Sequence, residues 1–82
     1  MSKVAGVHGP CVGRHPRHGL VLRVSRRKVH LLQADGYWSE EVIAVYRTKD
    51  EELLTMDQVR QKISAEELPS NTMEILESLK NP

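Results

Sequence analysis

The sequence predicts a small α+β domain, mainly β, in which a small barrel or curled antiparallel sheet of three to five strands precedes two short C-terminal helices. Two observations carry this prediction. Short runs of alternating aliphatic residues, separated by turn signals, fill the first part of the chain and are typical of strands. The last third contains helix-capping signals followed by apolar residues at helical spacing. We expect one domain over residues 1–82, with a basic β part at 1–53 and an acidic helical part at 54–82.

The first strands are expected to form a hairpin. In residues 18–24 three aliphatic side chains alternate onto one face. Residues 28–33 are the expected partner strand, with Val29 and Leu31 on a shared face. Residues 25–27 would connect the two strands, although this turn contains neither Gly nor Asn.

A third strand is expected at residues 41–47, after the turn signal at Asp35-Gly36. A helix starting at Ser39 is the alternative, because Ser39-Glu40-Glu41 resembles a first helical turn. Three of the five apolar residues in the run are β-branched, which favours the strand.

The two helices are predicted from their starts. Thr55 and Gln58 have the spacing of a capping box, which predicts a helix over about residues 56–63. Ser70 or Asn71 can cap a final helix that carries four apolar residues at helical spacing.

Length and cysteine content limit the class of protein. An 82-residue chain is too short for two independent cores, and its stability is expected to be thin, so a dimer or a complex stays open. The single cysteine, Cys11, cannot form an internal disulfide, which favours a reducing compartment. No apolar run is long enough to span a membrane or to act as a secretory signal. We expect a cytoplasmic protein that does not bind membranes.

The net charge of +1 conceals a strong asymmetry. Residues 1–47 contain eight Lys and Arg against three Asp and Glu, whereas residues 48–82 contain four against eight. If the two parts pack side by side, the protein has a basic face and an acidic face.

The basic residues form the most coherent candidate site. Three of them, at the expected hairpin tip, would lie close enough together to contact successive phosphates of a nucleic acid. An aromatic residue after the Asp35-Gly36 turn could stack on exposed bases, and of the two present we assign Trp38 to the core and leave Tyr37 open. The alternative is that the cations only keep the protein soluble and discourage edge pairing. The candidate nucleic-acid-binding residues are Arg14, Arg17, Arg23, Arg26, Arg27, Lys28 and Tyr37.

A Cys/His cluster near the N-terminus raises two further hypotheses. Zinc prefers thiolate and imidazole ligands, so His8, Cys11, His15 and His18 could supply a site, but their spacing does not match a known zinc finger. A Cys/His pair could also generate a nucleophile, but catalysis needs an orienting group and a pocket for which so short a chain offers little room. We therefore expect neither a cofactor nor enzymatic activity.

Residues 12–24, followed by a short strand, Asp35-Gly36 and another strand, resemble the small SH3-like barrels of the KOW and related classes. The resemblance covers roughly residues 12–47. It implies a partly open barrel that binds RNA, DNA or the transcription and translation machinery through its loops, without catalysis. The positions that match are the loops at residues 14–18, 26–28 and 35–38.

The sequence thus predicts a small, non-catalytic regulatory protein that binds a nucleic acid or a nucleoprotein complex. The alternative is a protein–protein adaptor or inhibitor that docks on an enzyme through its sheet edge or its C-terminal helices.

Overall fold

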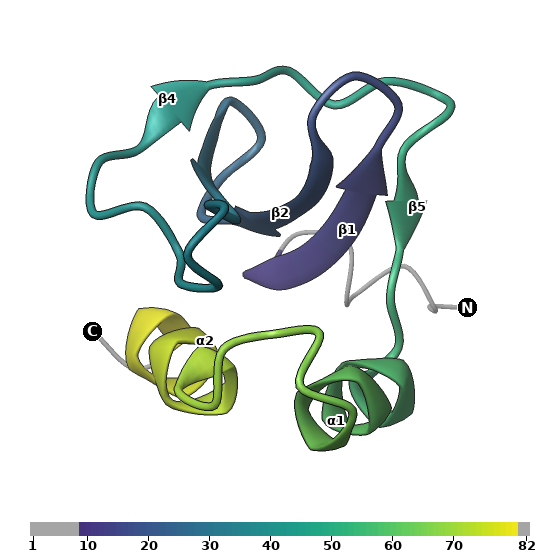
Figure 1. The fold of residues 1–82 in the computed structure, drawn as a ribbon. Coiled ribbons are helices and arrows are strands. Elements are labelled where there is room, and N and C mark those ends of the chain that lie inside the picture. The colour runs from purple at the N-terminus through teal and green to yellow at the C-terminus, as the bar shows by residue number, and fades with distance from the viewer. Residues whose placement is uncertain (1–8, 81–82) are drawn as a thin grey trace.

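Five strands form one antiparallel sheet, and two helices lie together below it in the computed structural model, which describes residues 9–80 (Figure 1). The strand order is β4-β3-β2-β1-β5. The fold is therefore α+β, with the strands preceding the helices as predicted. The elements are β1 (Cys11–His15), β2 (Gly19–Arg23), β3 (Lys28–Leu31), β4 (Ile43–Ala44), β5 (Glu52–Leu53), α1 (Met56–Ser64) and α2 (Thr72–Lys80).

The predicted hairpin is confirmed by the pairing of β2 with β3. Val21 lies opposite Leu31 and Arg23 lies opposite Val29. The connecting turn has no glycine, and it is closed by the backbone N–H groups of Val24 and Ser25, which both donate to the carbonyl oxygen of Lys28 at 3.0 and 3.2 Å.

The first strand, β1, lies where the sequence predicts the start of a loop. It pairs with β2 on one side and with β5 on the other, so it lies inside the sheet. Gly13 makes this arrangement possible, because a Cβ atom there would come within 3.0 Å of Glu51 Oε2 and 3.2 Å of the Glu52 carbonyl oxygen. Arg14 and His15 are therefore strand residues and not loop residues.

The third predicted strand is shorter than expected. Only Ile43 and Ala44 form a ladder, opposite Val29 and Lys28. Beyond them, the Val45 N–H still donates to the Arg27 carbonyl oxygen at 2.8 Å, which keeps the following residues beside the β2–β3 turn.

The sheet is curled but open. Strands β4 and β5 are its two edges, and within residues 9–80 no pairing joins them. Closure into a barrel therefore stays a prediction.

The core lies on both faces of the sheet. The larger cluster joins Val12, Leu22 and Trp38 to Val59 of α1 and Leu76 of α2, so both helices cover this face. A smaller cluster on the other face contains Val21, Val29 and Val45. Trp38 is a core residue as predicted, and its Nε1–H donates to Thr72 Oγ1 at 2.9 Å.

The helices begin where the sequence predicts. The Thr55 hydroxyl accepts the Gln58 N–H at 3.1 Å, and the Gln58 side chain accepts the Thr55 N–H at 2.9 Å, which completes the capping box. Helix α2 begins directly after Asn71, one of the two predicted caps. In the described part of the chain neither helix is long and apolar enough to cross a membrane.

Candidate nucleic-acid interface

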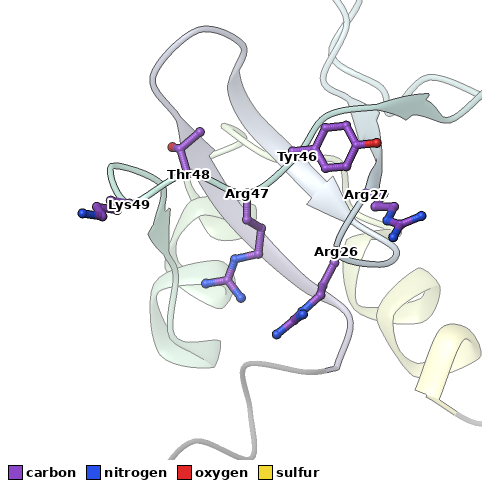
Figure 2. Close-up of a pocket in the computed structure, with 6 residues that line it drawn as sticks. All are labelled: Arg26, Arg27, Tyr46, Arg47, Thr48 and Lys49. Carbon is purple, nitrogen blue, oxygen red and sulfur yellow. The ribbon is translucent and has the colours of Figure 1, made fainter.

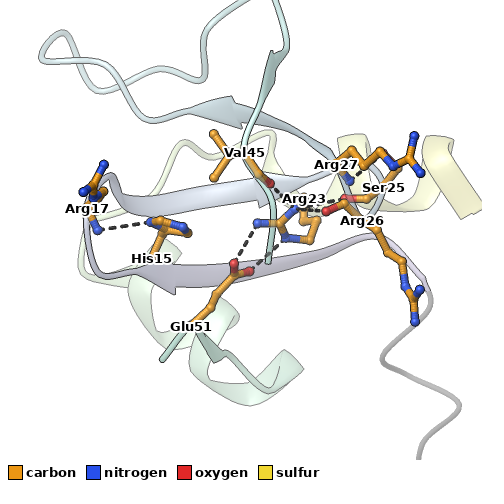
Figure 3. A network of polar contacts seen from close by, with 8 residues as sticks. All are labelled: His15, Arg17, Arg23, Ser25, Arg26, Arg27, Val45 and Glu51. Carbon is orange, nitrogen blue, oxygen red and sulfur yellow. Dashed lines mark hydrogen bonds and ion pairs between the residues drawn. The ribbon is translucent and has the colours of Figure 1, made fainter. Parts of the chain in front are cut away.

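The predicted basic residues do not form one surface. Arg17 lies in the β1–β2 turn, whereas Arg26 and Arg27 lie in the β2–β3 turn, at the opposite end of β2 (Figure 3). The five-residue strand β2 separates the two turns by roughly 16 Å. Arg14, on β1, is exposed and forms a 3.9 Å ion pair with Glu52 of the neighbouring strand β5. Arg14 and Arg17 therefore lie on a different part of the surface from Arg26 and Arg27.

Arg23 is an interior residue, which corrects its assignment to the basic surface. Its side chain is only 3% exposed and forms a bidentate ion pair with Glu51, with Nε–Oε2 at 2.8 Å and Nη2–Oε1 at 2.7 Å. A guanidinium buried in this way has no surface left for a phosphate. The charge pattern alone could not separate Arg23 from its neighbours, because the carboxylate that pairs with it lies 28 residues further along the chain.

The remaining Nη1 atom of Arg23 connects two segments of backbone. It donates to the carbonyl oxygens of Ser25 at 3.1 Å and Arg26 at 3.0 Å in the β2–β3 turn. It also donates to the carbonyl oxygen of Val45 at 2.8 Å, in the segment that follows β4 (Figure 3). The buried guanidinium therefore holds the turn and this segment at a fixed separation.

A basic pocket opens between these two segments (Figure 2). Its volume is about 550 Å³, within the range of ligand-binding clefts. Four cationic side chains, and no Asp or Glu, are among the described residues that line it. The basic pocket is lined by Arg26, Arg27, Tyr46, Arg47, Thr48 and Lys49.

Sequence reasoning identified two of these cations and missed the rest of the pocket. Tyr46 and Arg47 belong to the strand predicted at residues 41–47, and Lys49 lies beyond its end. A signal was available in the predicted topology. If residues 41–47 pair antiparallel with residues 28–33, the end of the former run lies beside the turn before Lys28.

Lys28 and Tyr37 lie outside the basic pocket. Lys28 is exposed at the start of β3, directly after the turn. Tyr37 is 62% exposed, but it lines a second hollow with the carboxylate side chains of Asp35, Glu40 and Glu41. These acidic neighbours repel a polyanion, so Tyr37 is poorly placed to stack on a nucleic-acid base.

The Cys/His cluster is dispersed by β1. Cys11 and His15 occupy opposite ends of this strand. The rings of His15 and His18 lie 5.1 Å apart, and His15 Nδ1 accepts the Arg17 N–H at 3.1 Å. Within residues 9–80 no three His, Cys, Asp or Glu side chains are grouped as metal ligands would be, and His8 lies outside the described residues.

Cys11 is half-buried, and this burial raises the pKa of its thiol despite the lowering effect of the Arg47 and Arg23 charges. The thiol is therefore protonated at neutral pH, whereas a nucleophile requires thiolate.

No protein-family model matches this chain, and neither the curated proteins nor the solved structures contain a significant match to it.

Proposed function

We propose that this protein is a small, non-catalytic nucleic-acid-binding protein, and that the basic pocket contacts the phosphate backbone. The observation that carries the proposal is the convergence of four cations from two chain segments around one hollow that no described carboxylate lines. Lysine and arginine side chains that neutralise phosphates release counterions, and this release supplies most of the sequence-independent affinity.

The buried Arg23 gives the proposed interface its rigidity. Long cationic side chains on mobile loops lose conformational entropy when they bind. Here the backbone at Arg26 and the backbone at Val45, two residues before Arg47, are joined through the Nη1 atom of Arg23, and the Arg27 carbonyl oxygen accepts the Val45 N–H. The relative position of the two backbone segments is therefore set before a ligand arrives.

The resemblance to KOW and related SH3-like barrels is compatible with this proposal. Those domains have short meandering strands in a partly open barrel and bind nucleic acids or nucleoprotein machines through loops. Of the three loops that match those domains, the one at residues 26–28 contributes Arg26 and Arg27 to the basic pocket. We accordingly propose a regulatory role in transcription or translation, and a cytoplasmic location stays a prediction that rests on the lone Cys11.

A fluorescence-anisotropy titration against labelled single-stranded RNA, single-stranded DNA and duplex DNA tests the proposal at about 50 mM salt, where phosphate contacts are strong. We expect binding that the double variant Arg26→Ala/Arg27→Ala weakens strongly. The matched control is Arg60→Ala/Lys80→Ala, which removes the same charge from exposed positions on α1 and α2. Absence of binding to all three ligands, or equal loss in both double variants, contradicts the proposal.

A second candidate function is supported by the β4 edge. Val42 and Ile43 are exposed there, and an edge strand presents unpaired backbone groups to which a partner strand can add. The helices are less suited to docking, because Val59 and Leu76 pack into the core. If the protein is an adaptor, Ile43→Lys abolishes binding of its protein partner and Arg26→Ala/Arg27→Ala does not.

A further inference from the structure

Tyr46 is an exposed aromatic ring in a cationic setting. The residue is 64% exposed and lines the basic pocket together with Arg26, Arg27, Arg47 and Lys49. It contributes nothing to either core cluster of the described residues. A ring left in solvent at the wall of a pocket offers a flat apolar face to a ligand.

The two exposed tyrosines differ in their electrostatic surroundings. Tyr37 shares its hollow with Asp35, Glu40 and Glu41, whereas the described lining of the pocket around Tyr46 contains only cationic and neutral residues. A polyanion that also carries aromatic rings is therefore attracted to Tyr46 and repelled from Tyr37.

A single nucleotide unit of a nucleic acid combines those two properties. Its phosphate is anionic and its base has a π-face that stacks on aromatic side chains. In a duplex the faces of the bases are covered by their neighbours, so only an unpaired or extruded base can stack on a protein ring. Tyrosine in this setting thus favours single strands over duplexes.

The layout of the cations is also suited to a short stretch of single strand. The four cations of the basic pocket come from residues 26–27 and 47–49, two segments held together by Arg23. Of the other two exposed candidate arginines, Arg17 lies in the β1–β2 turn, at the opposite end of β2 (Figure 3). Arg14 lies on β1 and forms an ion pair with Glu52. The four cations and Tyr46 therefore line one pocket, in which Arg27 lies on the same side as the Tyr46 ring (Figure 2).

We propose that the basic pocket binds single-stranded nucleic acid, with one unpaired base stacked on Tyr46 and the flanking phosphates bound by Arg26, Arg27 and Arg47. This inference rests on the proposed nucleic-acid-binding function and specifies the form of its ligand. The shared chemistry is an unpaired base with adjacent phosphates, which both RNA and DNA supply.

The test compares Tyr46→Leu and Tyr46→Phe with the unaltered chain, using an eight-nucleotide oligouridine, its deoxy counterpart oligodeoxyuridine, and a duplex DNA long enough to stay paired under the conditions of the titration. Because Tyr46 is exposed, both variants should keep the fold, and thermal unfolding checks this. Tyr46→Leu should weaken binding to the single strands at least about fivefold, since stacking is lost, and Tyr46→Phe should retain it. The duplex should bind more weakly than either single strand. The difference in affinity between the two single strands shows whether the sugar contributes to binding.

A second readout follows the stacking itself. A 2-aminopurine placed in the single strand loses fluorescence when its ring stacks, and we expect this quenching with the unaltered chain and with Tyr46→Phe but not with Tyr46→Leu. If Tyr46→Leu binds as tightly as the unaltered chain, or the duplex binds as tightly as the strands, the single-strand inference is wrong. If Tyr46→Leu still binds the oligonucleotides and Arg26→Ala/Arg27→Ala does not, the proposed nucleic-acid-binding function is retained although the single-strand inference is wrong. Failure of every oligonucleotide to bind overturns both proposals.

Discussion

The guanidinium of Arg23 and the carboxylate of Glu51 form a buried, bidentate ion pair that joins β2 to the residue preceding β5. The same guanidinium donates to the backbone carbonyl groups of Ser25, Arg26 and Val45, in the two segments between which the basic pocket opens. Each polar atom of the pair therefore has a partner, which is the condition for burying charge at a tolerable cost in free energy. The ion pair links the stability of the fold to the geometry of the proposed interface.

Replacing Glu51 should destabilise the protein strongly. Glu51→Leu leaves the Arg23 cation buried without a counter-charge, and loss of one partner of such a pair costs about 3–5 kcal/mol. Urea unfolding followed by circular dichroism measures the loss. The matched control is Glu52→Leu, because Glu52 belongs to the exposed pair with Arg14 and should contribute less than about 1 kcal/mol. Similar effects of the two substitutions would show that the buried pair does not stabilise the fold.

Gly13 is predicted to be sterically required. In Gly13→Ala the new Cβ atom would lie 3.0 Å from Glu51 Oε2 and 3.2 Å from a backbone oxygen, so β5 or the ion pair must shift. Overpacking of this kind costs about 1–3 kcal/mol. Gly9→Ala is the control, since nothing lies within 4 Å of its Cβ position. Thermal unfolding should show a lower midpoint for Gly13→Ala than for Gly9→Ala, and equal midpoints would refute the close approach.

Thr72 should matter through the indole of Trp38. Thr72→Val keeps the volume of the side chain but removes the acceptor for the Trp38 Nε1–H, and an unsatisfied buried donor costs about 1–3 kcal/mol. Chemical unfolding monitored by the fluorescence of this single tryptophan gives the value. An unchanged midpoint would mean that the indole finds another acceptor.

The Cys11 thiol should be a slow nucleophile. Burial raises its pKa, so at neutral pH less thiolate is present in the folded protein than in the unfolded chain. We expect iodoacetamide to alkylate Cys11 more slowly in the folded protein than in the chain unfolded by urea. The midpoint of the alkylation rate as a function of pH should also be higher for the folded protein.

The same shift gives stability a pH dependence. Because the folded pKa of Cys11 is raised, its stabilising contribution is present below the unfolded pKa and is lost as the pH rises through the folded pKa. The free energy of unfolding should therefore fall in this alkaline range, and Cys11→Ala should lack that component. Faster alkylation in the folded protein than in urea would reverse the sign of the shift and contradict both expectations.

Local patterns predicted much of the fold. The β2–β3 hairpin and the capping box at Thr55 follow from residues close together in sequence. The burial of Trp38 was predicted from composition, because the chain has no Phe and only one Trp. The strands β1 and β5 could not be predicted in this way. Gly13 and Arg14 interrupt the apolar pattern of β1, and the pairing of β1 with β5 joins residues about 40 positions apart. Periodicity carries no information about such distant pairing.

The candidate site shows the same limit. Arg26 and Arg27 were identified because they are adjacent in sequence, but the cations that complete the basic pocket arrive from residues 47–49. Arg23 has the same charge and lies in the same run, and only tertiary structure shows that Glu51 holds it in the interior.

The salt dependence of single-strand binding tests the central claim most directly. The three arginines proposed to bind phosphates give a slope of about −2 when log K is plotted against log salt concentration, since each contributes about −0.7 for single strands. Arg26→Ala/Arg27→Ala should reduce this slope by about 1.4 units, whereas Arg60→Ala/Lys80→Ala should leave it unchanged. A slope near zero for the unaltered chain, or the same reduction in both variants, would contradict a phosphate-binding role for the basic pocket.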